Sequence, residues 1–281
     1  MRPILVPSDF SGNSTTALRY AIRLAAIWKT SVLVIHCSPY PANPEYISGS
    51  PEEKKRILDR EAESVMKKLQ KQVGAAYHYL GRKLDPETRV SVFFNPMIVE
   101  QLIATAKAKS VGLIVLGSHG ATGLKKLLFG STASLLIAKS PLPVLAIPQQ
   151  YRYRKIKSLA YASDLDNLKP ELKKIIEFAE PLKAGIGIVH FEADPALWVS
   201  REKLAVRTLK TTGYHRLSFK MLPSNSERPV YRQLMDYVKQ SDSQWLVMFT
   251  RVHSFREKIF QQSATGNLAA ALPLPLLSFQ K

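Results

Sequence analysis

Short apolar segments alternate with amphipathic segments along the first half of the chain. Apolar residues recur every three or four positions in Asn13–Lys29 and in Glu52–Val73, which predicts two helices. Pro96 is expected in the first turn of a third helix that runs to about Lys109, and residues 38–51, rich in Pro and Gly, predict a loop. The predicted strands are Ile4–Pro7, Ser31–Cys37, Thr88–Phe94, Gly112–Leu116 and Val144–Ile147, and a further helix is predicted at Ser131–Lys139. This alternation predicts an α/β fold, in which helices cover both faces of a parallel sheet.

The second half of the chain repeats the first. Residues 113–147 and 245–279 align without a gap at an offset of 132, which places Pro141–Leu142–Pro143 on Pro273–Leu274–Pro275. Other pairs in this register are Val115 with Val247, Ser131 with Ser263, Leu136 with Leu268 and Ala138 with Ala270. Because the same residues recur at the same stage of the same strand–helix order, the sequence indicates a duplication.

The length of the chain and the starts of its halves lead to the same domain division. A chain of 281 residues is long enough for two typical domains. Ser8–Asp9 at the end of the first strand matches Ser163–Asp164 in the second half. We therefore predict two tandem open-sheet domains, residues 1–150 and 151–281, that meet in the polar, basic segment Gln149–Lys157.

Composition places the chain among folded proteins of a reducing compartment. Hydrophobic residues make up 46% and charged residues 22% of the chain, which is enough apolar material for packed cores. Cys37 is the one cysteine, so no internal disulfide can form. The start of the chain lacks the apolar run and cleavage site of a signal peptide, and no stretch reaches the ~20 apolar residues of a membrane span. We expect a cytoplasmic protein without a membrane segment.

The formal net charge of +18 raises the question of a nucleic-acid partner. Residues 1–150 and residues 151–281 each carry +9, so the charge is not concentrated in one domain. Basic residues stand among acids, as in Glu52–Arg56, which is typical of a solvated helix face. Without a focused basic cluster or an aromatic RNA-binding signature, we expect no dedicated nucleic-acid face. Diffuse positive charge nevertheless favours polyanions, including nucleotide phosphates.

A glycine-rich loop after the fourth predicted strand is the main candidate for ligand binding. It reads Gly117–Ser118–His119–Gly120 and, after nine residues, Gly130–Ser131–Thr132 at the start of a helix. Glycines let a backbone approach a ligand closely, and the free N–H groups of a helix start attract anions such as phosphate. The spacing is neither that of a Walker loop nor that of a dinucleotide-binding loop. An ordinary glycine turn followed by a capped helix is the alternative interpretation.

Asp9 favours the ligand-binding interpretation of this loop. Ligands of open parallel sheets bind beyond the carboxyl ends of the strands, where the strand order reverses. If the order is 3-2-1-4-5, this point lies between the first and fourth strands, so Asp9 and Gly117–Gly120 would converge there. The alternative role for Asp9 is to cap the helix that follows Ser11–Asn13.

Taken together, these motifs resemble the universal stress protein family, and the tandem arrangement resembles its double-domain members. The resemblance covers the whole first half and rests on four motifs. These are Val6–Pro7–Ser8–Asp9, Gly117–Ser118–His119–Gly120, Gly130–Ser131 and the closing Ser140–Pro141–Leu142–Pro143–Val144–Leu145. It implies a stress-response or signalling protein, a five-stranded sheet of order 3-2-1-4-5 in each domain, and one bound ATP, AMP or ADP, with or without Mg²⁺.

The resemblance also implies a role for individual residues of the first half. Pro7, Ser8 and Asp9 would line the adenosine side, Cys37 would lie against the adenine, and Leu116 and Gly117 would form the floor. His119 and Gly120 would face the ribose and phosphates, and Gly130, Ser131 and Thr132 would hold the phosphates. Cys37 as a small buried hydrophobe and His119 as an exposed loop residue are the alternatives.

The second half lacks the glycines of this motif. Phe249, Val252 and Gln262 stand where the alignment places Gly117, Gly120 and Gly130. Side chains at these positions would take up the space that a triphosphate needs, so we expect a structural or partner-binding role for residues 151–281. Arg251 and Arg256 leave open a different anionic ligand.

Three functions remain to be separated: nucleotide binding, slow ATP hydrolysis and a nucleotide-free scaffold. The loop between Gly120 and Gly130 offers Lys125 and Lys126 but no acid to hold a metal, which favours binding over phosphoryl transfer. Single-domain members of the family pair through their fifth strands. The resemblance therefore implies that the two halves pair in the same way within one chain, and a homodimer of the chain is also considered.

Overall fold

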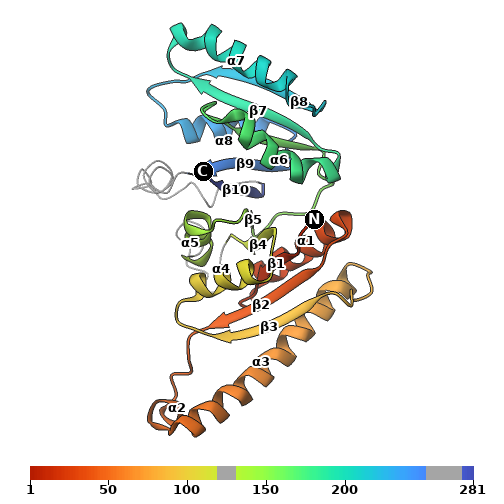
Figure 1. Cartoon of the computed structure of the whole chain (residues 1–281), viewed down its shortest axis with the longest axis vertical. Helices are drawn as coiled ribbons and strands as arrows, with labels where there is room; N and C mark the ends of the chain where they lie inside the picture. Colours follow the sequence, from red (N-terminus) through yellow and green to blue (C-terminus); the bar gives the residue numbers. More distant parts are fainter. Residues whose placement is uncertain (119–130, 251–273) are drawn as a thin grey trace. The chain divides into compact units, whose positions relative to one another are not determined.

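The computed structural model describes residues 1–118, 131–250 and 274–281 (Figure 1). These residues form two compact units, Met1–Gln149 and Gln150–Lys281, called unit 1 and unit 2 below. In the described residues, no helix combines the length and the apolar composition that crossing a membrane requires.

Unit 1 is built on five parallel strands in the order β3-β2-β1-β4-β5. The strands are β1 (Ile4–Pro7), β2 (Val32–Ser38), β3 (Arg89–Phe94), β4 (Leu113–Gly117) and β5 (Val144–Ile147). Ile4 of β1 aligns with Val32 of β2 on one side and with Leu113 of β4 on the other. Strands covered on both faces are apolar throughout, which is why Ile4, Leu5 and Val6 are all fully buried. The predicted order 3-2-1-4-5 is confirmed.

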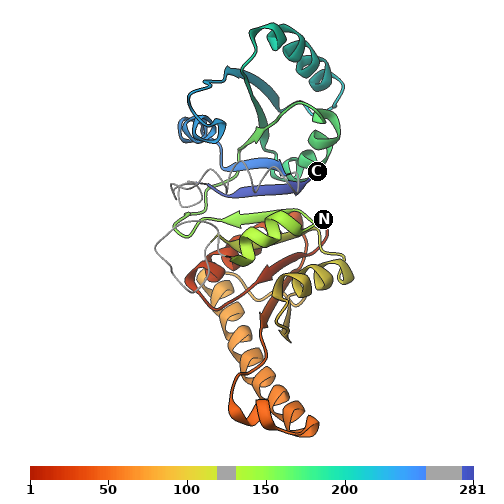
Figure 2. The ribbon, with the colours of Figure 1, turned by 90° about the vertical axis from the view of Figure 1, so that its left-hand side faces the viewer.

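Helices cover both faces of this sheet. They are α1 (Gly12–Trp28), α2 (Pro44–Ser48), α3 (Pro51–Tyr79), α4 (Ile98–Ala108) and α5 (Ser131–Lys139). Crossovers between parallel strands are right-handed, so steps in opposite directions along the sheet place their helices on opposite faces. The chain steps from β1 to β3 through α1 and α3, which contact each other, and steps back through α4 and α5, which also contact each other (Figure 2).

Three features of the helices in unit 1 differ by more than one residue from the sequence-based expectation. α3 continues six residues past Val73, because Ala76 and Tyr77 are buried and the Tyr77 hydroxyl lies 2.7 Å from the Thr88 hydroxyl. The expected loop 38–51 contains the short helix α2, whose cap Asn43 accepts a hydrogen bond of 2.9 Å from the Tyr46 N–H.

The third difference is at the start of α4. The prediction that Pro96 stands in its first turn is wrong, since α4 begins at Ile98. Asn95 Oδ1 accepts a hydrogen bond of 2.9 Å from the Met97 N–H, and this turn encloses Pro96 before the helix starts. Asx turns of this kind compete with helix formation, which moves the start two residues along the chain.

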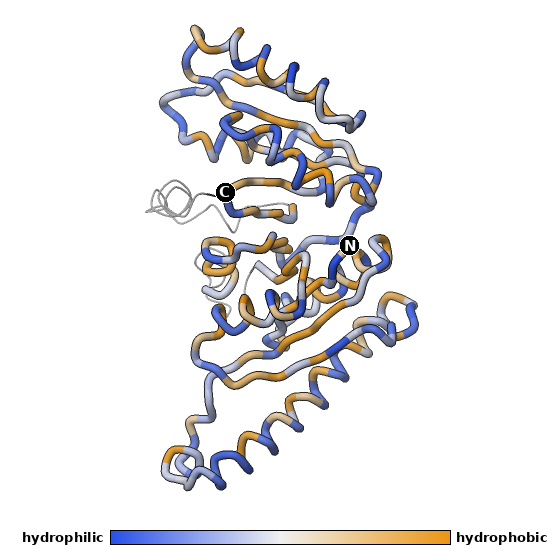
Figure 3. Tube along the Cα trace, viewed as in Figure 1, coloured by the Kyte–Doolittle hydropathy of each residue, from blue (hydrophilic) through white to orange (hydrophobic). Residues whose placement is uncertain are grey.

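Unit 2 has the same strand order. Its strands are β6 (Ser158–Ala162), β7 (Gly185–Glu192), β8 (Leu217–Pro223), β9 (Trp245–Thr250) and β10 (Leu276–Gln280). All pairs are parallel, in the order β8-β7-β6-β9-β10. The helices are α6 (Leu168–Leu182), η1 (Pro195–Leu197), α7 (Trp198–Lys210) and α8 (Val230–Gln240). As in unit 1, the central strands contain runs of apolar residues (Figure 3).

The turn that follows the first strand is the same in both units. Ser8 Oγ accepts a hydrogen bond of 3.2 Å from the Phe10 N–H, and Phe10 is left-handed with φ of 63°. Ser163 Oγ accepts one of 3.0 Å from the Leu165 N–H, and Leu165 has φ of 66°. A bulky residue with positive φ is uncommon, so its recurrence after equivalent serines is what a duplication predicts.

Candidate functional site

A cavity of about 180 Å³ opens in unit 1 at the carboxyl ends of β1, β2 and β4. Its lining includes eight of the eleven residues to which the family resemblance assigns a role: Pro7, Ser8, Asp9, Cys37, Leu116, Gly117, Ser131 and Thr132. The structure therefore brings together residues from both ends of the unit 1 sequence. The other three residues, His119, Gly120 and Gly130, lie outside the described residues.

The sheet order explains why the cavity forms at this place. β1 lies between β2 and β4, and the chain leaves β1 toward β3 but leaves β4 toward β5. Neighbouring crossovers therefore diverge at the ends of β1 and β4, and a crevice remains between them. Asp9 follows β1 and Gly117 ends β4, so both face this crevice.

The cavity has five further lining residues that the sequence did not indicate: Ser14, Ile35, Ile98, Leu102 and Ala133. Ile98 and Leu102 lie four residues apart in α4, so they share one face of the helix. The sequence predicted a helix at the position of α4. The apolar face alone does not tell which of its residues cover the sheet and which border a cavity.

Asp9 holds the turn before α1 but does not cap the helix. Its Oδ1 accepts a hydrogen bond of 3.0 Å from the Ser11 N–H, and Asp9 is exposed to solvent. The cap is Ser11, whose hydroxyl accepts a hydrogen bond of 3.1 Å from the Ser14 N–H. The alternative interpretation of Asp9 as the cap is therefore wrong, and its carboxylate stands at the mouth of the cavity.

Ser8 is fixed by hydrogen bonds that run through two partly buried polar side chains. Its hydroxyl donates a hydrogen bond of 2.6 Å to Gln72 Oε1, and Gln72 Nε2 donates one of 2.9 Å to the Thr15 hydroxyl. Since Ser8 is 5% exposed and already bonded, it shapes the cavity wall. His36 Nδ1 lies 2.8 Å from the Ser8 carbonyl oxygen and fixes the backbone at the same point.

The missing side chain of Gly117 makes room for α1. A Cβ placed on Gly117 would lie 2.9 Å from the carbonyl carbon, the Cβ and the carbonyl oxygen of Asn13. Carbon atoms in ordinary contact are ≈ 3.5–4.0 Å apart, so any larger residue would push against the start of α1. The glycine is therefore required by the approach of the helix, whether or not a ligand also approaches it.

Cys37 has features of both roles considered for it, a contact with the ligand and a small buried hydrophobic residue. It lines the cavity, and it is half-buried at the end of β2 with its sulfur 3.9 Å from the Asn95 carbonyl oxygen. Burial raises the pKa of the thiol, and the hydrogen bond to Asn95 offsets this only in part. At neutral pH the side chain is therefore an uncharged thiol that offers a soft, apolar surface.

The helix that carries the predicted phosphate-binding hydroxyls begins at Ser131, which is exposed, while Thr132 is partly buried. Both line the cavity. Of the residues that differ in the second half, only Phe249 can be placed. Arg251, Val252, Arg256, Gln262 and Ser263 lie outside the described residues.

Comparison with known proteins identifies the family. The model of the universal stress protein family matches residues 1–148. The chain belongs to the universal stress protein family. The universal stress protein MJ0531 of Methanocaldococcus jannaschii is 30% identical over 149 residues, which span 52% of this chain and 81% of that protein.

Solved structures of universal stress proteins share the fold over the whole chain. A universal stress protein of Archaeoglobus fulgidus DSM 4304 matches with a TM-score of 0.71 and 16% identity, covering 99% of this chain and 98% of that one. A protein described as a putative universal stress protein, from Pseudomonas aeruginosa UCBPP-PA14, matches with a TM-score of 0.59 and 15% identity, covering 100% and 93%. These matches cover both halves of the chain, so the second half shares the α/β fold of these proteins.

Proposed function

We propose that unit 1 binds one adenine nucleotide, ATP in the first instance, and that the protein acts in stress response or signalling through this bound nucleotide. The observation that carries the proposal is the cavity at the ends of β1, β2 and β4, which gathers Asp9, Cys37, Ser131 and Thr132 from three separate segments. Family membership supports it.

The chemistry of the lining suits a nucleoside. Ile35, Ile98, Leu102 and Leu116 offer an apolar slot for a base, and the Asp9 carboxylate at the mouth can accept hydrogen bonds from ribose hydroxyls. Ser131 and Thr132 stand in the first turn of α5, where backbone N–H groups and the helix dipole favour phosphate oxygens.

The size of the cavity limits what the described residues alone can hold. About 180 Å³ is smaller than the roughly 300–1,000 Å³ of most ligand pockets, so these residues suit the base and sugar better than a triphosphate. Residues 119–130, to which the resemblance assigns ribose and phosphate contacts, are not among those described. We assign the phosphates to His119, Gly120, Gly130, Ser131 and Thr132 on the resemblance.

Binding, and not rapid hydrolysis, is the proposed activity. Phosphoryl transfer needs a group that holds the metal and one that positions the nucleophile. Among the described residues that line the cavity, Asp9 is the one carboxylate, and it lies on the side that we assign to the sugar. Slow hydrolysis remains the second candidate, with Mg²⁺ held by phosphates and not by a preformed acidic cluster.

Replacing Asp9 with Asn is the sharpest test, because it separates the ligand role from the structural one. Asn keeps the oxygen that accepts the hydrogen bond from the Ser11 N–H, so the fold should be unchanged. We expect ATP affinity to fall about tenfold through loss of a charge-assisted hydrogen bond to ribose. Calorimetry should give one site per chain for the wild type. Unchanged affinity in this variant, or two equivalent sites, would contradict the proposal.

A matched pair of variants tests the location of the site. Ile98→Trp narrows the unit 1 cavity, and Val230→Trp makes the same change at the position 132 residues later. ATP binding should be lost in the first variant and kept in the second.

Two further measurements test the identity of the ligand and the absence of rapid hydrolysis. Mass spectrometry of small molecules released from the denatured wild-type protein should find an adenine nucleotide. The rate of ATP turnover should be far below the ~10 s⁻¹ of typical enzymes.

We also propose that the two halves pair through their fifth strands. Each sheet ends on its fifth strand, β5 or β10, and each of these pairs within its own unit on one side only. An unpaired, apolar edge invites aggregation, so mutual pairing would protect both edges. Expression of residues 1–150 alone should then give a homodimer or an aggregate. A monomeric fragment that binds ATP with full affinity would rule this out.

A further inference from the structure

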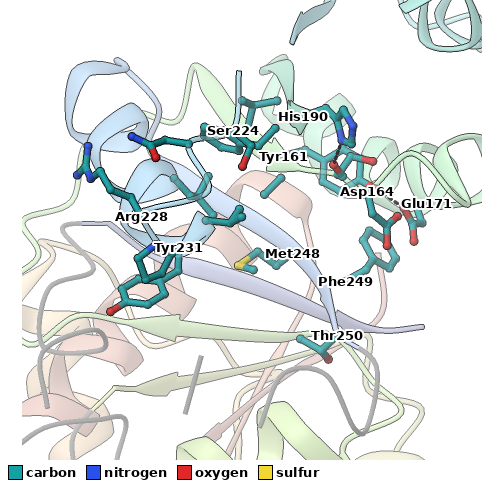
Figure 4. A pocket seen from close by; sticks show the side chains of 18 of the residues that line it. Tyr161, Asp164, Glu171, His190, Ser224, Arg228, Tyr231, Met248, Phe249 and Thr250 are labelled. Carbon is teal, nitrogen blue, oxygen red and sulfur yellow. Dashed lines mark hydrogen bonds between the residues drawn. The ribbon is translucent and has the colours of Figure 1, made fainter. Parts of the chain in front are cut away.

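Unit 2 contains its own cavity, although its sequence lacks the glycine motif. The cavity has a volume of about 660 Å³ and lies at the carboxyl ends of β6, β7 and β9 (Figure 4). It occupies the same place in the fold as the cavity of unit 1. Equivalent lining residues are Ser8 and Ser163, Asp9 and Asp164, Ile35 and Val189, Cys37 and Phe191, Ile98 and Val230, Leu102 and Leu234, and Leu116 and Met248.

The floor and one wall of this cavity are apolar and rich in polarisable groups. Met248 lies at the end of β9, Phe191 at the end of β7, and Leu234 in α8. Phe249 does not fill the cavity, because its ring stacks on Phe279 with centroids 4.8 Å apart. Thioether and aromatic side chains favour flat rings, and a volume of this size holds a ligand larger than a single ring.

All four fully charged side chains in the lining already lie in ion pairs. Lys281 Nζ lies 2.5 Å from Asp164 Oδ2 and 3.4 Å from Glu171 Oε1. Arg228 Nη2 lies 2.6 Å from Asp236 Oδ2. A phosphate group would have to draw Arg228 or Lys281 away from a carboxylate, and a cation would have to displace Lys281. Moving Lys281 would leave the carboxylate of Glu171, which is 4% exposed, buried without its cation, and this is costly. The Arg228–Asp236 pair is exposed to solvent, so moving Arg228 costs little.

Groups that can hydrogen-bond without net charge surround the apolar floor. The buried Tyr161 hydroxyl donates to Glu171 Oε2, and burial raises the pKa of Tyr161, so it stays a neutral donor. Ser224 also lines the cavity (Figure 4). His190 also lines the cavity, but its Nδ1 lies 2.9 Å from the Ser163 carbonyl oxygen and its Nε2 lies 3.4 Å from Glu192 Oε2, so both ring nitrogens already have partners. This arrangement can orient hydroxyl and ring-nitrogen groups of a ligand.

We propose that the cavity of unit 2 binds an uncharged, ring-bearing small molecule of about nucleoside size, and not a nucleotide. The apolar floor holds the ring, the neutral polar groups on the walls hold its hydroxyls, and the buried Lys281–Glu171 pair disfavours a charged ligand. Unit 2 is then a binding domain with a ligand class of its own, independent of any nucleotide in unit 1.

NMR of the full chain labelled with ¹³C at the methionine methyl groups tests the proposal directly. Met248 lines the cavity, and a Met248→Leu variant assigns its signal. The probes are adenosine, which carries a ring and a sugar, indole, which is a ring alone, and ATP, which shares its ring with adenosine but is charged. Adenosine or indole should shift the Met248 signal in a saturable manner, and ATP should bind at this signal about tenfold more weakly or not at all.

Two variants show whether the shift reports the cavity. Val230 is 53% exposed, so Val230→Trp can narrow the cavity without repacking a core, and it should abolish the shift. Ile98→Trp in unit 1 is the matched control and should leave the shift unchanged. The proposal is overturned if neither uncharged probe moves the signal, if ATP moves it as strongly as adenosine, or if Val230→Trp leaves it intact. Failure of ATP to bind unit 1 would leave these readouts unaffected.

Discussion

A substitution of Gly117 distinguishes two reasons for a glycine at this position, the approach of a ligand and the approach of α1. If the glycine serves the approach of a ligand, Gly117→Ala should weaken nucleotide binding and leave stability intact. If it serves the approach of α1, as the structure indicates, the substitution should destabilise unit 1 even without a ligand. The added methyl group would lie 2.9 Å from three atoms of Asn13, two of them in the backbone.

The size of the effect follows from this geometry. Overpacking of this kind costs typically 1–3 kcal/mol, and the lower unfolded-state entropy of Ala returns roughly 0.4–1 kcal/mol. We expect a net loss of about 1–2 kcal/mol, which corresponds to a fall of roughly 2–8 °C in the melting temperature of a unit of this size. Because a two-unit chain need not unfold in one step, hydrogen exchange read by peptide is the better assay. Exchange should accelerate in β1 and β4 but not in β6 and β9.

Gly74→Ala is the matched control for this experiment. Gly74 lies inside α3, and a Cβ placed on it meets nothing within 4 Å. Ala should therefore stabilise α3 by about 0.5–1 kcal/mol through its higher helix propensity, which is the opposite sign. The reasoning fails if the backbone amide hydrogens of β1 and β4 exchange as slowly in the Gly117→Ala variant as in the wild type. Normal stability combined with lost ATP binding would restore the ligand explanation.

Three further predictions concern thiol reactivity and the turns before α1 and α6. The Cys37 thiol should react with iodoacetamide more slowly than glutathione at pH 8, because burial raises its pKa above 9.0. Its contribution to stability is present below pH 9.0 and is lost as the pH rises through the folded-state value, which urea titrations at pH 8 and pH 10 would detect. Ser11→Ala should cost unit 1 about 0.5–2 kcal/mol in urea unfolding, whereas Ser11→Asp should keep the cap. Ser163→Ala should cost about 1 kcal/mol by removing the acceptor of the Leu165 N–H, with faster hydrogen exchange confined to unit 2, and an effect in unit 1 would contradict this.

Local patterns predicted the elements well where burial and periodicity agree. β1 and β5 have the predicted bounds, because each is a short apolar run between clear turns. The α4 start was wrong, because Pro96 fits both a helix start and the turn that Asn95 forms. Sequence periodicity cannot weigh one local hydrogen bond against another.

The candidate site in unit 1 came from a family resemblance combined with a topological rule. Pro7, Asp9 and Gly117 could be expected to converge once the strand order was assumed, since the order fixes where the crossovers diverge. The positions of Ile98 and Leu102 in the cavity lining could not be predicted, because they depend on how closely α4 approaches β2. That distance follows from side-chain volumes on several elements at once and leaves no local sequence signal.

The cavity of unit 2 shows why a lost motif is weak evidence for a lost site. The sequence showed Phe249 in place of Gly117, which suggested that a side chain would take the space of a ligand. In unit 1 the glycine makes room for Asn13 of α1, so its loss in unit 2 concerns how α6 meets the sheet. Phe249 stacks on Phe279 and leaves about 660 Å³ open beside it. The divergence of crossovers creates a crevice in any sheet of this order, and the lining then decides which ligand class it accepts. The repeated strand order thus gives this chain two crevices, and Phe249 in place of the glycine leaves the second one open.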